Sequence, residues 1–336
     1  MTRKHNRRSK APALRRATKH AAKRAAKAQY RVRNWAEYNQ SLIQRGSITL
    51  WISDDVLSAW RPRGSAPRVR GGQKQYSDGA IECLLMVKSV YHLPLRATEG
   101  FAQSLCALLK VEVPIPDYTT LCRRAKTLTV ALPATATGPI HAVLDSTGLK
   151  VFGEGEWKVR KHGYSKRRTW RKLHLGVDEA TGEIQAEELT EASMDDAAMV
   201  DPLLEQTEAV VEQLSADGAY DKEKVYTTAQ TQGVATITIP PRRDAHIWQH
   251  GNCAAPPHPR DENLRRIRDV GRKQWKEESG YHRRSLAETT MFRFKTIFGD
   301  QLAARELARQ KTEARIKCAA LNRMTRLGMP DSYRLT

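Results

Sequence analysis

The chain has 336 residues, of which 40% are hydrophobic, so it can bury a core in one large domain or in two smaller ones. Its 57 Lys and Arg outnumber its 37 Asp and Glu, and the net charge of +20 favours a polyanionic partner such as nucleic acid, with a simply basic soluble protein as the alternative. The composition excludes a membrane-spanning protein, because no apolar run approaches the ~20 residues of a transmembrane helix.

The cysteines and the N-terminal residues bear on the cellular compartment. The five cysteines are dispersed, and no pair has Cys-x2-Cys spacing. Such an odd, scattered set predicts reduced thiols in the cytoplasm and not a disulfide framework. The N-terminus is basic and lacks the apolar segment of a signal peptide.

A basic arm opens the chain. Residues 1–33 contain thirteen Lys or Arg, and the first acidic residue is Glu37. Nothing apolar there would pack a helix, so we predict an arm that is disordered without DNA and orders along phosphates, with a solubilising tail as the alternative. Residues 34–75 follow as a small unit rich in tryptophan, and their Arg-, Pro- and Gly-rich end predicts a linker.

Residues 76–130 predict three helices. Ser77 or Asp78 can cap the first, Pro94 opens the second, and Asp117 starts the third. A DNA-binding helix-turn-helix is one interpretation of this region, and an ordinary helical bundle is the other. In the first interpretation, the third helix offers three cations for DNA contact, namely Arg123, Arg124 and Lys126.

From residue 139 onward the pattern changes to strands. Apolar, β-branched stretches predict strands at 140–152, 172–178, 183–189, 210–215 and 234–239. Helices are predicted at 195–205, at 221–232, after residue 280 and at about 302–324. The order β-β-β-α-β-α-β-α over residues 139–328 is that of the ribonuclease-H-like fold, an α/β domain with a mixed sheet and helices on both faces. Residues 329–336 are predicted to form a tail.

A basic hairpin interrupts these strands at residues 154–174. The stretch 158–172 holds eight Lys or Arg and no acidic residue, which predicts contact with DNA phosphates. The residues proposed for this contact are Lys158, Arg160, Lys161, Lys166, Arg167 and Arg168.

An insertion at residues 240–280 contains five prolines and is predicted to be irregular. It carries two aromatic candidates for nucleic-acid contact, Trp248 and Trp275. A zinc site is the alternative use of its loose group of potential ligands, but their spacing fits no common zinc motif. These potential ligands are His246, His250, Cys253 and His258.

The stretch from Tyr281 to Lys295 contains neither Gly nor Pro and predicts a helix. At ~100° per residue, Tyr281, Arg284, Glu288 and Lys295 fall within an arc of about 60°. One face then carries a carboxylate flanked by two cations and a phenol, as expected where a carboxylate holds a metal and cations hold phosphate. The alternative is an ordinary exposed Glu–Arg pair, which stabilises a helix by only a few tenths of a kcal/mol.

Two further carboxylates have places beside Glu288. Asp145 lies within an apolar strand, where an unpaired charge is costly unless a cation offsets it, and Asp217 precedes Gly218 at a strand end. Each alone is explained as a strand-end or turn aspartate. In a ribonuclease-H-like fold, however, these three elements bring their carboxylates together. Their oxygen ligands suit Mg2+, and two such ions can activate a nucleophile and stabilise a leaving oxygen.

The pattern Tyr-x2-Arg-x3-Glu-x6-Lys at 281–295 resembles, without a gap, the signature around the catalytic glutamate of bacterial DDE transposases of the insertion-sequence-four and insertion-sequence-five families. The resemblance to the insertion-sequence-five family covers the chain from Tyr30 to about Gly328. It implies that Asp145, Asp217 and Glu288 are the catalytic triad and bind two Mg2+ ions, for which Mn2+ can substitute.

The same resemblance implies roles for other residues near the triad. Tyr281, Arg284 and Lys295 are expected to grip DNA near the scissile phosphate. In related transposases, an aromatic residue of a comparable insertion stacks on an unpaired base at the transposon end. Either Trp248 or Trp275 is predicted to do so here.

The resemblance implies a DNA transposase that binds terminal inverted repeats, cleaves the ends by Mg2+-dependent hydrolysis and joins the 3′-hydroxyls to target DNA. Its expected partners are double-stranded DNA and further copies of itself, as a dimer or higher oligomer, with no membrane partner. We expect it in the cytoplasm, associated with the bacterial nucleoid. The alternatives are a transposase-derived DNA-binding protein without cleavage activity and a simple nuclease of ribonuclease H type.

Overall fold

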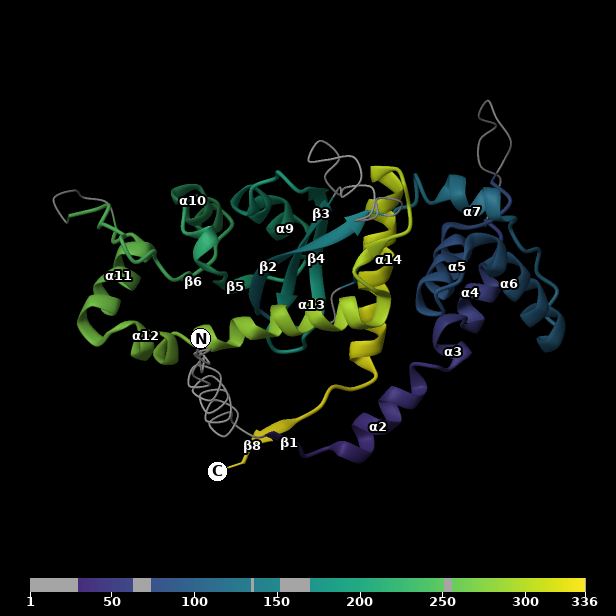
Figure 1. Ribbon diagram of the computed structural model, residues 1–336, viewed down its shortest axis with the longest axis horizontal. Helices are drawn as coiled ribbons and strands as arrows, with labels where there is room; N and C mark the ends of the chain where they lie inside the picture. The colour runs from purple at the N-terminus through teal and green to yellow at the C-terminus, as the bar shows by residue number, and fades with distance from the viewer. Residues whose placement is uncertain (1–29, 63–73, 134–135, 152–169, 251–255, 336) are drawn as a thin grey trace, which may run out of the picture. The chain divides into compact units, whose positions relative to one another are not determined.

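The computed structural model describes residues 30–62, 74–133, 136–151, 170–250 and 256–335 and contains a mixed β-sheet (Figure 1). The sheet order is β4-β3-β2-β5-β6, and β7 pairs with the far end of β2. The strand β3 runs antiparallel to both β2 and β4, whereas β5 and β7 run parallel to β2 and β6 runs parallel to β5. The strands are β2 (Ile140–Val151), β3 (Trp170–Asp178), β4 (Ile184–Glu191), β5 (Val211–Ser215), β6 (Thr236–Thr238) and β7 (Gln301–Leu302).

Each face of the sheet has its own core, because successive side chains of a strand point to opposite faces. On β2, Val143 and Leu149 pack with α13 (Ser285–Phe298) and α14 (Leu307–Arg326). Ala142 and Leu144 pack instead with α9 (Val200–Gln206) and α10 (Glu223–Thr231). The expected α/β fold, a mixed sheet with helices on both faces, is therefore confirmed.

The helical region before the sheet contains the three helices that the sequence predicts. Ser77 caps the first by accepting a hydrogen bond from the Ala80 N–H at 3.1 Å, and Asp117 caps the third by accepting one from the Thr120 N–H at 2.7 Å. Two short helices precede them. The five helices are α3 (Ile48–Trp51), α4 (Asp54–Ser58), α5 (Asp78–Val90), α6 (Leu95–Leu109) and α7 (Tyr118–Arg124).

This helical region shares a core with the sheet. Trp51 and Trp60 are buried in the same cluster as α5, the inner side of α14 and the sheet residues Val143 and Leu173. The packing thus joins residues 47–326 into one unit, whereas the sequence predicted a helical region at 76–130 and a separate catalytic domain at 139–328. The wide apolar surface of α5 explains the difference, because most of the side chains between Ala80 and Ser89 are buried.

The last helix, α14, starts at Leu307 and not near residue 302 as predicted. Gln301 and Leu302 instead extend the sheet as β7, and the Glu313 carboxylate accepts hydrogen bonds from the N–H groups of Ala303 and Ala304 at 2.8–3.0 Å. Farther along α14, the Asn322 side chain bonds both the N–H and the carbonyl of Ile184, which clips the helix to β4.

The prediction of an irregular insertion at residues 240–280 is wrong for its second half, which forms α11 (Pro259–Val270) and α12 (Arg272–Glu278). His258 caps α11, Pro259 occupies its first turn, and acidic residues follow. The side chains that α11 buries include Arg260 and Asp261. Because charged residues occupy buried positions, the helix lacks the apolar periodicity by which a sequence reveals one.

The two ends of the described chain form a separate small unit. The strand β1 (Tyr30–Val32) pairs antiparallel with β8 (Ser332–Arg334), and the Ser41 hydroxyl of α2 (Trp35–Gln44) donates to the Gly328 carbonyl at 3.2 Å. Residues 329–336 were predicted to be a tail, but three of them, Ser332–Arg334, pair with β1. A three-residue strand has no sequence signal of its own when its partner lies some 300 positions away. The predicted basic arm and basic hairpin fall largely on residues 1–29 and 152–169, outside the described residues.

Glu187, on the α14 side of β4, yields a prediction about stability. Its side chain is buried, one carboxylate oxygen has no hydrogen-bond partner among the described residues, and burial raises its pKa to about 7 against the lowering effect of Arg315. The unfolded glutamate ionises near 4.5, so its contribution to stability is full below pH ~4.5 and is lost as the pH rises toward 7.

We therefore expect Glu187→Gln to raise the free energy of unfolding at pH 8 by about 2–3 kcal/mol, with a much smaller gain at pH 5. Urea denaturation at both pH values measures this difference. Glu188→Gln is the matched control, because Glu188 is partly exposed and pairs with Lys311 at 2.5 Å, so its loss should change stability by less than about 1 kcal/mol. A Glu187→Gln protein that is less stable than wild type at pH 8 would contradict the assignment.

Candidate active site

Asp145 lies inside β2, on the face of the sheet that α13 covers. It shares that face with Val143, whereas its neighbour Leu144 packs on the opposite side. Its carboxylate accepts a hydrogen bond from the Ser146 N–H at 2.8 Å, and its side chain is 16% exposed. A half-buried carboxylate in a strand needs a cation nearby, because burial alone disfavours its charged form.

Asp217 reaches the same region from the neighbouring strand. The strand β5 pairs with β2 as far as Val143 and Ser215, and the chain continues from there to Asp217. The Asp217 carboxylate caps a 3-10 turn, η3 (Gly218–Tyr220), by accepting a hydrogen bond from the Ala219 N–H at 2.8 Å. Gly218 suits this turn, because a Cβ there would lie 3.3 Å from the Pro240 carbonyl oxygen.

Glu288 lies in the first turn of α13. The residues before it, Tyr281–Arg284, form a 3-10 turn, η4, so the single helix predicted over 281–295 is wrong at its start. Gly280 precedes the turn with φ +66°, a conformation that favours glycine. Since residues three apart eclipse one another in a 3-10 turn, Tyr281 and Arg284 lie on one side, with the Arg284 Cζ 5.7 Å from the Tyr281 ring centroid.

Arg284 connects two of the three carboxylates. Its Nη1 lies 3.3 Å from the Asp145 Oδ2, and its Nη2 donates to the Glu288 carboxylate. The structure thus brings Asp145, Arg284 and Glu288 into direct contact, from a strand, a turn and a helix.

The pKa shifts place Asp217 in the same electrostatic environment. Burial raises the pKa of Asp145, its bond from Ser146 and the Arg284 guanidinium lower it, and the charges of Asp217 and Glu288 raise it further. Burial also raises the pKa of Tyr281, and Asp217 and Glu288 again contribute. Three carboxylates and a phenol therefore share one region, and their mutual repulsion favours binding of cations there.

Asp145 and Glu288 contact a guanidinium and do not enclose an open metal site. Within the described part of the chain, no three His, Cys, Asp or Glu side chains are grouped as ligands of one ion. The donors nevertheless fit Mg2+, since all are carboxylate oxygens, and the Glu288 side chain is 55% exposed and can reorient.

Comparison with protein families identifies the chain. A family model described as Transposase DDE domain matches residues 136–323, which is more than half of the chain. The chain belongs to the DDE transposase family. A second family model with the same description matches residues 43–154. The first match spans Asp145, Asp217 and Glu288, and the family supports a metal-dependent nuclease and recombination activity on DNA.

The predicted DNA contacts of the transposase differ in their surroundings. Lys295 lies two turns beyond Glu288 in α13 and forms no ion pair with the described carboxylates of the triad. Its charge acts instead on Asp300, whose pKa is lowered mainly by Lys150 and to a smaller extent by Lys295. Arg124 is held inside the fold by the Tyr76 carbonyl at 3.0 Å and by Asp78.

Two cations of α7 and its end remain at the surface. Arg123 is exposed and donates only locally, to the Thr120 hydroxyl at 3.2 Å, and Lys126 is exposed and pairs with Glu306 at 2.6 Å. The hairpin residues Lys158, Arg160, Lys161, Lys166, Arg167 and Arg168 lie outside the described residues.

The two candidate tryptophans are not equivalent. Trp275 is 2% exposed, donates from Nε1 to the Asn263 side chain at 3.2 Å, and packs with its ring centroid 5.9 Å from that of Tyr281. Trp248 is 40% exposed, and the Arg260 guanidinium covers its ring at 3.9 Å. Trp275 thus packs against Tyr281 inside the fold, whereas part of Trp248 is exposed to solvent.

The transposase also has a polar cluster on the opposite face of the sheet, which the sequence did not reveal. His174 of β3 pairs in register with Ser146, next to Asp145, and is fully buried. Its Nε2 lies 2.9 Å from the Thr190 hydroxyl and its Nδ1 lies 3.3 Å from Asp196. Burial lowers its pKa to about 4 against the raising effect of Asp196, so the ring is neutral at pH 7. A single histidine within a strand gives no sequence signal that it is buried beside an aspartate from a distant part of the chain.

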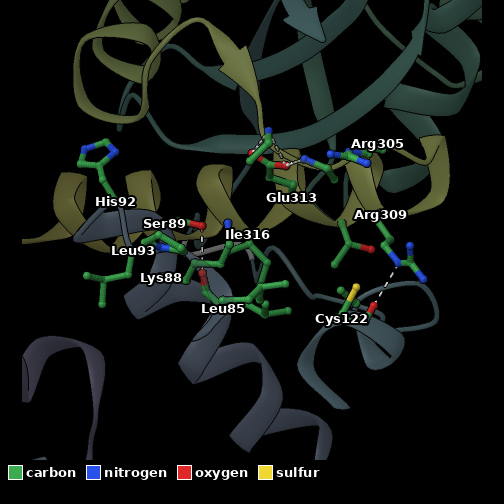
Figure 2. Close-up of a pocket in the computed structure, with 16 residues that line it drawn as sticks. Leu85, Lys88, Ser89, His92, Leu93, Cys122, Arg305, Arg309, Glu313 and Ile316 are labelled. Atoms are coloured by element: carbon green, nitrogen blue, oxygen red, sulfur yellow. Dashed lines mark hydrogen bonds between the residues drawn. The ribbon is translucent and has the colours of Figure 1, made fainter. Parts of the chain in front are cut away.

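A pocket of about 600 Å3 lies elsewhere, between α5, α7 and α14. Figure 2 shows Leu85, Ile316 and Leu93 around it together with cations such as Lys88 and Arg309. None of the predicted site residues lines it, so the candidate carboxylates and this pocket are separate features.

The insertion is anchored by a buried ion pair. Asp221 accepts from the Arg260 Nε at 2.7 Å, and both side chains are almost fully buried. The same guanidinium donates to the His246 carbonyl at 2.8 Å and covers Trp248. This pair holds α11 and the Trp248 segment to the chain just beyond Asp217.

We expect Asp221→Asn to destabilise the transposase by about 3 kcal/mol, because Arg260 loses its charged partner while buried. Asp269→Asn is the matched control: it also removes a carboxylate that pairs with an arginine, Arg266, but its side chain is 71% exposed, so the change should stay within about 1 kcal/mol. Urea denaturation measures both. Equal effects of the two substitutions would show that the Asp221–Arg260 pair does not anchor the insertion.

Proposed function

We propose that the chain is a DNA transposase of the insertion-sequence-five type, which binds terminal inverted repeats, cleaves them by Mg2+-dependent hydrolysis and joins the 3′-hydroxyl ends to target DNA. One observation carries this proposal: Asp145 and Glu288 both contact Arg284, and the charge of Asp217 acts on Asp145. The unbroken Tyr-x2-Arg-x3-Glu-x6-Lys spacing at 281–295 supports the family assignment at this finer level.

In this proposal, Asp145, Asp217 and Glu288 hold two Mg2+ ions, for which Mn2+ can substitute. Bound Mg2+ would activate the attacking oxygen and stabilise the leaving oxygen at a phosphodiester. The chain's own contribution is to fix the ligands: the Ser146 N–H orients Asp145, and the Ala219 N–H orients Asp217. The same site serves both reactions, with water as the nucleophile in cleavage and the freed 3′-hydroxyl in joining.

DNA contacts follow from the charges around this site. We assign Tyr281, Arg284 and Lys295 to contacts with the DNA strand near the scissile phosphate. Tyr281 and Arg284 lie in the turn directly before α13, and Lys295 lies in α13, the helix that carries Glu288. Farther away, exposed Arg123 and Lys126 are the α7 residues that we assign to phosphates. The basic arm 1–33 and the hairpin 154–174 would add contacts to the DNA backbone. Bringing two transposon ends together requires at least two protomers, and the site of action is the bacterial nucleoid in the cytoplasm.

The alternative from another class is a transposase-derived protein that binds DNA without cutting it. It requires the triad to be dispensable, whereas Asp145, Asp217 and Glu288 are all present. A simple nuclease of ribonuclease H type explains the triad but gives no use for the helical region and the positive charge of the chain.

Excision of a marker flanked by the native DNA ends tests the proposal. We expect Glu288→Gln to lower excision about a thousandfold or more while end binding persists, because the substitution keeps the size of the side chain and removes its charge. Glu277→Gln, a change of the same kind at an exposed residue of α12, should excise like wild type. Excision by Glu288→Gln at the wild-type level would contradict the assignment. End binding without excision by any of the three proteins would favour the DNA-binding alternative.

Trp248 is our candidate for stacking on an unpaired base at the transposon end. We expect Trp248→Ala to slow end processing about tenfold or more, since one base–aromatic stack contributes about 1–3 kcal/mol, and Trp248→Phe to retain most of the rate. Processing of labelled end duplexes by purified protein measures this effect. Wild-type processing by Trp248→Ala would remove the stacking role.

A further inference from the structure

Arg284 occupies the space between two carboxylates that the proposed mechanism needs for metal. Its guanidinium contacts Asp145 on one side, at 3.3 Å from Nη1 to Oδ2, and Glu288 on the other, through Nη2. The side chain is 19% exposed, and the Tyr281 ring lies against it at 5.7 Å. Arg284 therefore points into the carboxylate cluster.

The electrostatics explain this inward position. Asp145 is half-buried and lies in the field of Asp217 and Glu288, so without a cation its charged form is disfavoured. The guanidinium is permanently charged and presents several donors in one plane, so it can satisfy two carboxylates at once. Mg2+ would need the same carboxylate oxygens, and a divalent ion repels a guanidinium a few ångströms away.

We propose that Arg284 is a placeholder cation: it neutralises Asp145 and Glu288 in the DNA-free protein, competes with metal for them, and turns to a DNA phosphate when metal takes its place. This inference rests on the proposed function and deepens it. Arg284 is suited to such an exchange because a phosphate offers the same paired oxygen acceptors as a carboxylate. The free protein should then bind metal weakly, and DNA should strengthen metal binding by drawing Arg284 away.

The position of Arg284 in the chain is compatible with this exchange. It is the last residue of η4, directly before α13, and Gly280 begins the turn with φ +66°. The neighbouring Arg283 differs: its side chain is 59% exposed and pairs with Glu179, away from the triad. Two adjacent arginines thus carry the same charge, but only one of them contacts Asp145 and Glu288.

Binding of Mn2+ to the full-length, DNA-free protein tests the inference, with isothermal titration calorimetry as the readout. We expect Arg284→Gln to bind Mn2+ about tenfold or more tightly than wild type, a change typical of removing one charge within ~4–6 Å. Arg283→Gln removes the same charge one residue away and should bind within about twofold of wild type. If Arg284→Gln does not fold, Arg284→Lys replaces it; lysine lacks the planar fork by which the guanidinium contacts both carboxylates, so its Mn2+ affinity should also exceed that of wild type.

Asp145→Asn separates failure of this inference from failure of the proposed function. If Asp145→Asn abolishes Mn2+ binding but Arg284→Gln binds no more tightly than wild type, the placeholder role is wrong and the metal site stands. If wild type and Arg284→Gln both fold and neither binds Mn2+, the proposed metal site is wrong, and the placeholder role is wrong with it. Tighter binding by Arg284→Gln that Asp145→Asn removes supports both.

Discussion

The convergence of like charges is the constraint on which this structure depends. Two carboxylates a few ångströms apart repel by about 3–4 kcal/mol at an effective dielectric constant of about 20, and here a third acts on the same region. Asp145 adds the cost of burial within a strand. Such a cluster persists only where cations offset it, and in this conformation Arg284 provides part of that offset. The chemistry proposed for the site has the same requirement, because metal ions there would bind the carboxylates and a DNA phosphate at the same time.

The rest of the fold keeps the cluster in place from several sides. The core beneath α13 holds Phe294 and Phe298 against the sheet, so the helix that carries Glu288 cannot shift along β2 without losing buried contacts. Trp275 of the insertion packs behind Tyr281, which in turn contacts Arg284. The Asp221–Arg260 pair ties the insertion to the chain segment just beyond Asp217. The candidate site is therefore built from one strand, one loop and one helix, and a different set of buried contacts supports each of them.

Much of this architecture was predictable from local sequence signals. The caps at Ser77 and Asp117, the apolar strands and their order carry short-range information, and the structure agrees with them. The element that carries each of the three candidate carboxylates was also predictable: a strand for Asp145, a strand end for Asp217 and a helix for Glu288. The sheet order, which pairs β5 with β2 in parallel, then brings the chain at Asp217 close to the strand that carries Asp145.

The features that could not be predicted depend on contacts between distant residues. The helix α11 buries Arg260 and Asp261, so its pattern of apolar residues is nearly absent. The strand β8 exists only because β1 pairs with it. Arg284 was expected to face DNA, and its contact with Asp145, 139 positions away, depends on the fold. Likewise, only the burial of Trp275 distinguishes it from Trp248.

The most direct test of the central claim is whether the three carboxylates act as one unit. Single-turnover cleavage of a duplex that contains the native transposon end should be measured for Asp145→Asn, Asp217→Asn, Glu288→Gln and the triple variant, with end binding measured in parallel. We predict that each single variant cleaves about a thousandfold or more slowly than wild type. The triple variant should cleave no more slowly than the slowest single variant, as for residues of one catalytic site. Near-wild-type cleavage by any single variant, or losses that multiply in the triple variant, would contradict a shared site.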